Sequence, residues 1–158
     1  MSAQIRLVEI TETNRDAVVA LRVHPSQERF VASVERSFRD ARENPEAKPW
    51  FRAVCDGDTP VGFVMLCWDL VPRPGLLGPF FLWRLLVDAE HQGRGYGRAI
   101  LNEVVALLRA EGATELLTSC VPGEGSPEPF YRGYGFVPTG ETDEDGEVIL
   151  RLELGSRP

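Results

Sequence analysis

The chain has 158 residues, of which 43% are hydrophobic and 26% charged, enough for one globular domain with its own core. Its 24 acidic and 17 basic residues give a formal net charge of −7, which argues against a nucleic-acid binder and is compatible with a cationic partner. No apolar run approaches the roughly 20 residues of a membrane span. The amino terminus, "MSAQIRLVEI", lacks a signal-peptide pattern, so we expect a cytoplasmic protein without membrane interaction, folded as a single domain over residues 1–158.

The first helices follow a short strand. Apolar and polar residues alternate over residues 5–10, which predicts a half-buried strand, and Asn14 then caps a short helix. A second helix is expected over about residues 28–43. Its apolar face is expected to consist of Phe30, Val31, Val34 and Phe38.

Two strands over residues 50–55 and 61–68 come next, and the Asp56-Gly57 pair between them is a strong hairpin signal. The sequence therefore predicts an antiparallel ribbon. Residues 71–79, "VPRPGLLGP", contain too much proline and glycine for a regular element and are predicted to form a loop.

The second half of the chain predicts a strand, helix and strand in succession. Residues 80–87 are apolar on both faces, as in a central strand, and residues 95–111 show the clearest helical periodicity of the chain. A third element, the strand over residues 115–121, completes a crossover unit, so the two strands are expected to be parallel. A short helix capped by Ser126 follows over residues 126–136, and two final strands are divided by "ETDEDGE".

The cysteines and histidines indicate no metal site. Cys55, Cys67 and Cys120 lie in apolar segments and are predicted to be buried free thiols rather than disulfides. Neither His24 nor His91 is near a cysteine, so no set of metal ligands is formed.

Three glycines, Gly93, Gly95 and Gly97, separate the central strand from the best-defined helix. Such a turn presents backbone N–H groups and the positive end of a helix dipole, which together bind phosphate. The P-loop pattern fails because Arg98 and Ala99 follow Gly97, and the dinucleotide-binding pattern fails because its sixth position is Arg98. A turn that merely tolerates glycine is disfavoured, since each glycine costs roughly 1 kcal/mol in ordered backbone.

The pattern that does fit is Gln/Arg-x-x-Gly-x-Gly/Ala, found here as "QGRGYG" at residues 92–97. With this motif and "FYRGYGF" at residues 130–136, the chain resembles the GCN5-related N-acetyltransferases (GNAT). The resemblance implies a mixed α/β fold: a mostly antiparallel sheet of six or seven strands, with a parallel pair splayed at strands four and five, flanked by about four helices. It also implies acetyl-CoA as the cofactor.

The resemblance assigns roles to individual residues. The glycine turn would bind the CoA pyrophosphate through Gln92, Gly93, Arg94, Gly95, Tyr96, Gly97 and Arg98. The backbone of Leu85, Leu86 and Val87 would bind the pantetheine arm and polarise the thioester carbonyl. Tyr131 matches the tyrosine that protonates the departing thiolate; a core tyrosine whose hydroxyl bonds a neighbour is the alternative.

Two positions depart from the family pattern. Many relatives carry a glutamate where this chain has Trp83, which cannot accept a proton, so the ammonium proton of an amine must leave through another carboxylate, a water chain or solvent. Glu28, Glu35 and Asp69 are candidates for that carboxylate because their segments border the cleft in the family. Glu124 replaces a frequent asparagine; either its loop is displaced or it faces the acceptor.

The amino-terminal half, including "ERFVASVERSFRDA", resembles the subgroup that acetylates diamines, spermidine and spermine. The expected reaction is direct attack of a primary amine of a small cationic acceptor on acetyl-CoA. The candidate acceptor-binding residues are Glu28, Glu35, Asp69, Trp83 and Glu124. The acidic run over residues 141–147 is interpreted as solvated turn residues.

Two alternatives stay open from the sequence. The acceptor could instead be an antibiotic or an amino acid, because both fit the same cleft. A non-catalytic acyl-CoA sensor would keep the glycine turn and lack the base, as the tryptophan at position 83 suggests. A homodimer is compatible with the resemblance, since relatives often pair through sheet edges or carboxy-terminal strands.

Overall fold

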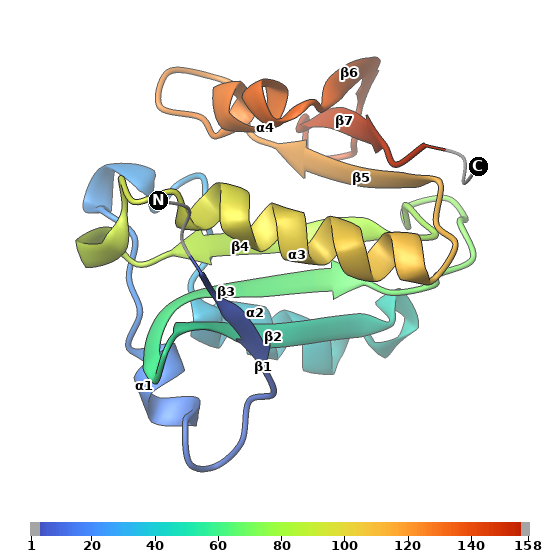
Figure 1. Ribbon diagram of the computed structural model, residues 1–158. Helices are drawn as coiled ribbons and strands as arrows, with labels where there is room; N and C mark the ends of the chain where they lie inside the picture. The colour runs from blue at the N-terminus through green and yellow to red at the C-terminus, as the bar shows by residue number, and fades with distance from the viewer. Residues whose placement is uncertain (1–3, 156–158) are drawn as a thin grey trace.

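The computed structural model describes residues 4–155, which form one seven-stranded sheet with helices on both faces (Figure 1). The strands are β1 (Arg6–Val8), β2 (Pro49–Asp56), β3 (Thr59–Cys67), β4 (Phe81–Val87), β5 (Glu115–Cys120), β6 (Val137–Thr142) and β7 (Val148–Glu153). The helices are α1 (Arg15–Val19), α2 (Val34–Glu43), α3 (Tyr96–Ala110) and α4 (Glu128–Tyr134). Three short 3₁₀ turns are η1 (Pro25–Gln27), η2 (Pro45–Ala47) and η3 (Ala89–His91).

The sheet has the strand order β1-β2-β3-β4-β5-β7-β6, and β4 and β5 form its parallel pair. These two strands pair at only two positions, Phe81 with Leu117 and Leu82 with Thr118. Beyond them β4 continues to the glycine turn and β5 continues toward α4, so the two strands diverge toward their carboxyl ends (Figure 1). The predicted mixed sheet and its splayed parallel pair are therefore confirmed.

A β-bulge divides β4. Arg84 pairs with Met65 and Leu82 pairs with Leu66, so Trp83 is an extra residue without a partner on β3. A bulge shifts the alternation of side chains along a strand by one position. As a result Arg84 lies on the α2 face of the sheet, where its Nη2 is 2.6 Å from Oδ2 of Asp40.

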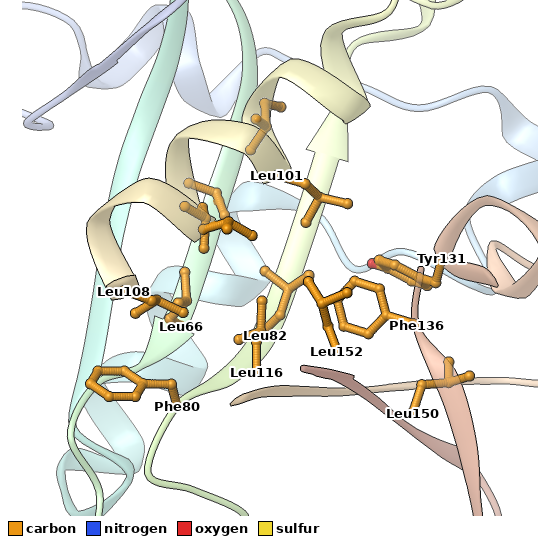
Figure 2. Close-up of a cluster of buried hydrophobic side chains, with 14 of the residues drawn as sticks. Leu66, Phe80, Leu82, Leu101, Leu108, Leu116, Tyr131, Phe136, Leu150 and Leu152 are labelled. Atoms are coloured by element: carbon orange, nitrogen blue, oxygen red, sulfur yellow. The ribbon is translucent and has the colours of Figure 1, made fainter. Parts of the chain in front are cut away.

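Two apolar clusters lie on opposite faces of the sheet. The α3 face carries the larger cluster, where Leu101 and Leu108 of α3 pack with strand residues such as Leu82, and Tyr131 and Phe136 extend it to α4 (Figure 2). The other face is covered by α1 and α2 through a cluster that includes Val18, Phe38, Phe63, Met65 and Leu86. Because helices cover both faces, β3 and β4 are apolar nearly throughout.

The predicted helix over residues 28–43 is wrong in its first part, because α2 begins only at Val34. Ser33 stops it from extending backwards: its backbone is extended, and its side chain accepts a hydrogen bond from the N–H of Arg36 at 3.0 Å. Phe30 and Val31 consequently lie in an irregular segment rather than on the helix face. That segment reaches the site described below.

The structure also differs from the sequence prediction in details at the ends of some helices and strands. The first strand is shorter than residues 5–10. Asn14 occupies the N-cap position of α1 as predicted, but its side chain makes no capping hydrogen bond, and its Oδ1 accepts instead from the N–H of Thr11. Pro127, not Ser126, occupies the N-cap of α4, although the Ser126 hydroxyl accepts a hydrogen bond from the N–H of Glu128 at 3.2 Å. Within residues 4–155 no helix is long and apolar enough to cross a membrane.

All three cysteines are buried and free, as predicted. Burial raises the pKa of the Cys67 thiol to about 12 and raises the pKa of Cys55 and Cys120 as well. A thiol with a raised pKa is a poor nucleophile at neutral pH, so these side chains belong to the core.

Candidate active site

The turn between β4 and α3 depends on glycine. Gly93 and Gly95 have φ of +79° and +82°, and a β-carbon on either residue would meet nothing within 4 Å. Gly95 is also the N-cap of α3, so no side chain caps the first amides of that helix. The turn thus combines an open backbone surface with the positive end of a 15-residue helix, the arrangement that binds phosphate.

Two side chains fix the turn to the sheet. The hydroxyl of Tyr96 donates a hydrogen bond to the carboxylate of Asp56, and this bond is the main cause that raises the pKa of Tyr96. Nε2 of Gln92 donates to the carbonyl oxygen of Val87 and to Oε1 of Gln27, both at 2.9 Å. Tyr96 and Gln92 therefore belong to the turn and also hold it against the sheet.

A cavity of about 470 Å³ opens between this turn, β4 and α4; we call it the α3 cavity. The turn contributes Gln92, Gly93, Gly95, Tyr96, Gly97 and Arg98 to its lining. The opposite wall consists of Leu85, Val87, Phe130 and Tyr131, with Val23, Gln27, Phe30 and Val31 closing one side. Two of the predicted cofactor residues do not line it: Arg94 is exposed on the turn, and the buried Leu86 side chain faces α2.

Backbone groups of β4 also face the splay. Consecutive residues of a strand direct their N–H and C=O groups to opposite neighbours. Because Asp88 donates to Val61 at 2.9 Å and Leu86 pairs with Phe63, the groups of Leu85 and Val87 point away from β3. These backbone groups are directed into the gap between β4 and β5.

Tyr131 lies in the wall of the α3 cavity. Only 7% of its surface is exposed, and its ring packs against Phe136 with centroids 5.3 Å apart (Figure 2). Burial raises the pKa of Tyr131, with a further contribution from Cys120 and an opposing one from the Thr118 hydroxyl. The phenol is therefore fully protonated at neutral pH and can donate a proton only to a strong base beside it.

A second cavity of about 310 Å³ lies on the other side of Tyr131, at the carboxyl end of β5; we call it the β5 cavity. Five residues line both cavities: Phe30, Val31, Leu85, Pro127 and Tyr131. Residues that line the β5 cavity but not the α3 cavity include Glu28, Arg36, Trp83, Arg84, Ser119 and Glu147. The splay of the sheet thus holds two adjoining spaces with a common wall.

The five acceptor candidates are placed differently. Glu28 and Trp83 line the β5 cavity. Glu35 lies exposed in the first turn of α2, and Glu124 lies exposed on the loop before α4, where its carbonyl oxygen accepts a hydrogen bond from Arg29; neither lines these two cavities. Asp69 lies at the opposite end of the sheet, because β3 runs antiparallel to β4 and ends beside the start of β4.

Trp83 packs in the core beside the Arg84 guanidinium, 5.6 Å from the ring centroid, and offers no proton acceptor.

Glu147 is a cavity residue that the sequence did not indicate, because it was interpreted as part of a solvated acidic turn. It is half-buried, lines the β5 cavity and accepts a hydrogen bond from the Ser119 hydroxyl at 3.0 Å. The sequence feature that could have indicated this place is the position of Glu147 directly before the last strand, at the end of the acidic run.

Comparison with known proteins now identifies the class. The model of the acetyltransferase (GNAT) family matches residues 7–136, which is most of the chain. The protein belongs to this family and is an N-acetyltransferase. The family resemblance drawn from the glycine motif is confirmed.

Three similar proteins show how far the likeness extends in sequence and in structure. Spermine/spermidine N(1)-acetyltransferase from Bacillus subtilis (strain 168) is 28% identical over 154 residues, covering 95% of this chain and 99% of the relative. Among solved structures, an acetyltransferase from Thermus thermophilus has a TM-score of 0.67 at 22% identity, with 97% of this chain and 99% of that one covered. PaiA N-acetyltransferase from Thermoplasma acidophilum, in complex with coenzyme A, has a TM-score of 0.65 at 17% identity, with coverage of 95% and 99%.

Proposed function

We propose that this protein transfers the acetyl group of acetyl-CoA to a primary amine of a small cationic acceptor of the diamine or polyamine type. The observation that carries the proposal is the pair of adjoining cavities, one beside the glycine turn and one beside β5, with Tyr131 in their common wall. A two-substrate transfer needs two spaces that meet at the reacting atoms. The names of the 28% identical relatives support a polyamine acceptor.

The α3 cavity fits coenzyme A by its chemistry. The uncapped amides that follow Gly95 would bind the pyrophosphate, and Arg98 on the cavity wall and the exposed Arg94 of the same turn would supply positive charge. The backbone groups of Leu85 and Val87 that face the splay would bind the pantetheine amides. A free N–H in this edge would also polarise the thioester carbonyl as its oxygen gains negative charge.

Tyr131 would act as the general acid. The neutral amine attacks the thioester carbon, the C–S bond breaks, and the phenol gives its proton to the departing thiolate. Since burial raises the pKa of Tyr131, its proton is held until the strongly basic thiolate forms beside it. The phenolate then regains a proton from the nitrogen that has become acetylated.

The acceptor is tested with a panel of amines. Purified protein with acetyl-CoA is given putrescine, spermidine, spermine, an aminoglycoside and several amino acids, and thiol release is followed. Thiol release above the no-acceptor background with the polyamines supports the proposal. Selective turnover of the aminoglycoside or of an amino acid would show that the acceptor is not a polyamine. Thiol release at the background rate with every amine would contradict transfer to these amines altogether.

A further inference from the structure

We infer that Glu147 receives the proton of the acceptor ammonium and so replaces the glutamate that this chain lacks at Trp83. This role rests on the proposed function, because it requires an amine acceptor. Three observations carry it: the position of Glu147 at the open end of the splay, the fixed geometry of its turn, and the lack of a competing ion pair among the described residues.

The position follows from the pairing of β5 with β7. Ser119 pairs with Ile149 and Cys120 pairs with Val148, so Glu147 lies one residue beyond the last pair, beside the carboxyl end of β5. There it lines the β5 cavity together with Tyr131. Glu28, the other carboxylate in this lining, is exposed, whereas Glu147 is half-buried.

The turn holds this carboxylate in one place. Oδ1 of Asp143 accepts hydrogen bonds from the N–H groups of Asp145 and Glu147, each at 2.9 Å, and the Asp143 N–H donates to the carbonyl oxygen of Glu147 at 2.9 Å. The Ser119 hydroxyl then donates to Oε1 at 3.0 Å. One carboxylate oxygen is thereby oriented by serine, and the other is left to contact a ligand.

Glu147 forms no ion pair with the arginines that line the cavity, although its charge interacts with that of Arg84 over a longer distance. Arg84 is bound to Asp40 at 2.6 Å and Arg36 approaches the same carboxylate at 3.5 Å, while Glu147 takes part in none of the ion pairs found among residues 4–155. On the turn, carboxylate oxygens of Asp143 and Asp145 lie within 4.8 Å of that of Glu147. This concentration of negative charge attracts an ammonium group to the rim of the cavity.

The proton balance is as follows. The acceptor enters as an ammonium and gives one proton to the Glu147 carboxylate, which releases it to solvent. The amine lone pair attacks the thioester carbon, and the second proton leaves the nitrogen through Tyr131 to the thiolate. One ammonium and one thioester thus yield one amide, one thiol and one released proton.

The other titratable groups in the lining of the β5 cavity come from five places in the chain. They are Arg84 on β4, Cys120 on β5, Tyr131 on α4, Arg36 on α2, and Glu28 with Arg29 on the segment before α2, apart from the two turn aspartates. None of these arginines loses its charge near neutral pH, and burial raises the pKa of Cys120 and Tyr131. A pH-dependent difference between wild type and a Glu147 variant at pH 6–9 therefore reports on Glu147 and the acceptor amine.

The test compares Glu147→Gln with Glu144→Gln, an exposed residue of the same turn that lies outside the β5 cavity lining. With spermidine at about pH 7.5, Glu147→Gln should lower kcat/KM at least about 100-fold, the usual range for a lost general base, and Glu144→Gln should not. Coenzyme A affinity by calorimetry should stay at the wild-type value in both. The deficit of Glu147→Gln should shrink as the pH rises, because more of the amine is already neutral.

The outcomes separate the two proposals. If wild-type protein turns over spermidine and Glu147→Gln does so equally well, the role of Glu147 is wrong while the proposed function stands. A deficit that is the same at every pH would also contradict proton acceptance, since it would reflect binding alone. If wild-type protein acetylates no amine of the panel, the proposed function and this role are both overturned.

Discussion

The ring of Phe130 on α4 lies against the α-carbon of Gly97 on α3, so close that a β-carbon at Gly97 would stand 3.0 Å from Cζ of the ring. Both residues line the α3 cavity. Gly97→Ala should leave the free energy of unfolding within about 1 kcal/mol of wild type, since alanine favours the helix by about that amount and the ring, 38% exposed, can move. The displaced ring should raise the Kd for coenzyme A, measured by calorimetry.

A second substitution checks the cause. In a Phe130→Leu background the smaller side chain leaves room for the new methyl group, so Gly97→Ala should weaken coenzyme A binding less than it does alone. Equal weakening in both backgrounds would show that the contact with Phe130 is not responsible.

Gly95 and Gly112 form a matched pair at the two ends of α3. Both have φ of +82°, and a β-carbon on either would meet nothing within 4 Å. Each change to alanine should cost about 1 kcal/mol of stability in urea denaturation, because the left-handed backbone disfavours a β-carbon. Only Gly95→Ala should weaken coenzyme A binding; equal affinities in the two variants would remove the turn from the cofactor site.

Tyr131→Phe removes the proposed proton donor without changing the shape of the core. The variant should lower kcat about 100-fold and leave coenzyme A affinity nearly unchanged, as expected for a group that acts in the transition state. Tyr134→Phe is the control, because its hydroxyl bonds Asn102 at 2.7 Å outside the α3 cavity lining. Wild-type turnover by the Tyr131 variant would exclude it as the acid.

Tyr96→Phe tests the anchor of the glycine turn. Its hydroxyl is bonded to the Asp56 carboxylate, and the loss of a hydrogen bond to a charged group costs about 1.5–3 kcal/mol, less where water reaches the carboxylate as it does here. We expect a loss of about 1 kcal/mol in urea denaturation together with weaker coenzyme A binding. Lower stability with unchanged binding would limit Tyr96 to a structural role.

Alkaline pH should destabilise the protein through its buried thiols. The pKa of Cys67 is raised by burial to about 12, so the folded state keeps a proton that the unfolded chain loses from about pH 9. Its stabilising contribution is complete below that pH and is lost as the pH rises toward 12. The fall in unfolding free energy between about pH 8 and about pH 10.5 should be smaller in Cys67→Ala than in wild type; identical falls would contradict this.

The elements that could be predicted are those specified by neighbouring residues. Apolar periodicity gave α3 to within a residue at each end, the Asp56-Gly57 signal gave the hairpin of β2 and β3, and the glycine spacing gave the family. Each depends on local backbone preference or on a pattern repeated within one element. The parallel pairing of β4 with β5 followed in turn from the crossover rule.

What could not be predicted depends on contacts between distant segments. The bulge at Trp83 depends on register with β3, and the partner of Arg84 is Asp40 on α2. Glu147 comes to lie beside the carboxyl end of β5 only because β7 pairs with β5. In the sequence, its acidic run cannot be distinguished from a solvated turn. Residues 28–33 have helical periodicity, but the Ser33 cap starts the helix only at Val34 and leaves them irregular. The sequence alone does not show which of these two preferences prevails.

The wall shared by the two cavities limits how acceptor preference can be altered by engineering. Five residues line both spaces, so replacing one of them changes the shape of both cavities at once: Phe30, Val31, Leu85, Pro127 and Tyr131. Positions that line the β5 cavity but not the α3 cavity, such as Glu28 and Arg36, can be changed without altering the wall of the α3 cavity. A library that varies these two positions, with the common wall kept fixed, would explore new amines while the affinity for the acetyl donor is retained.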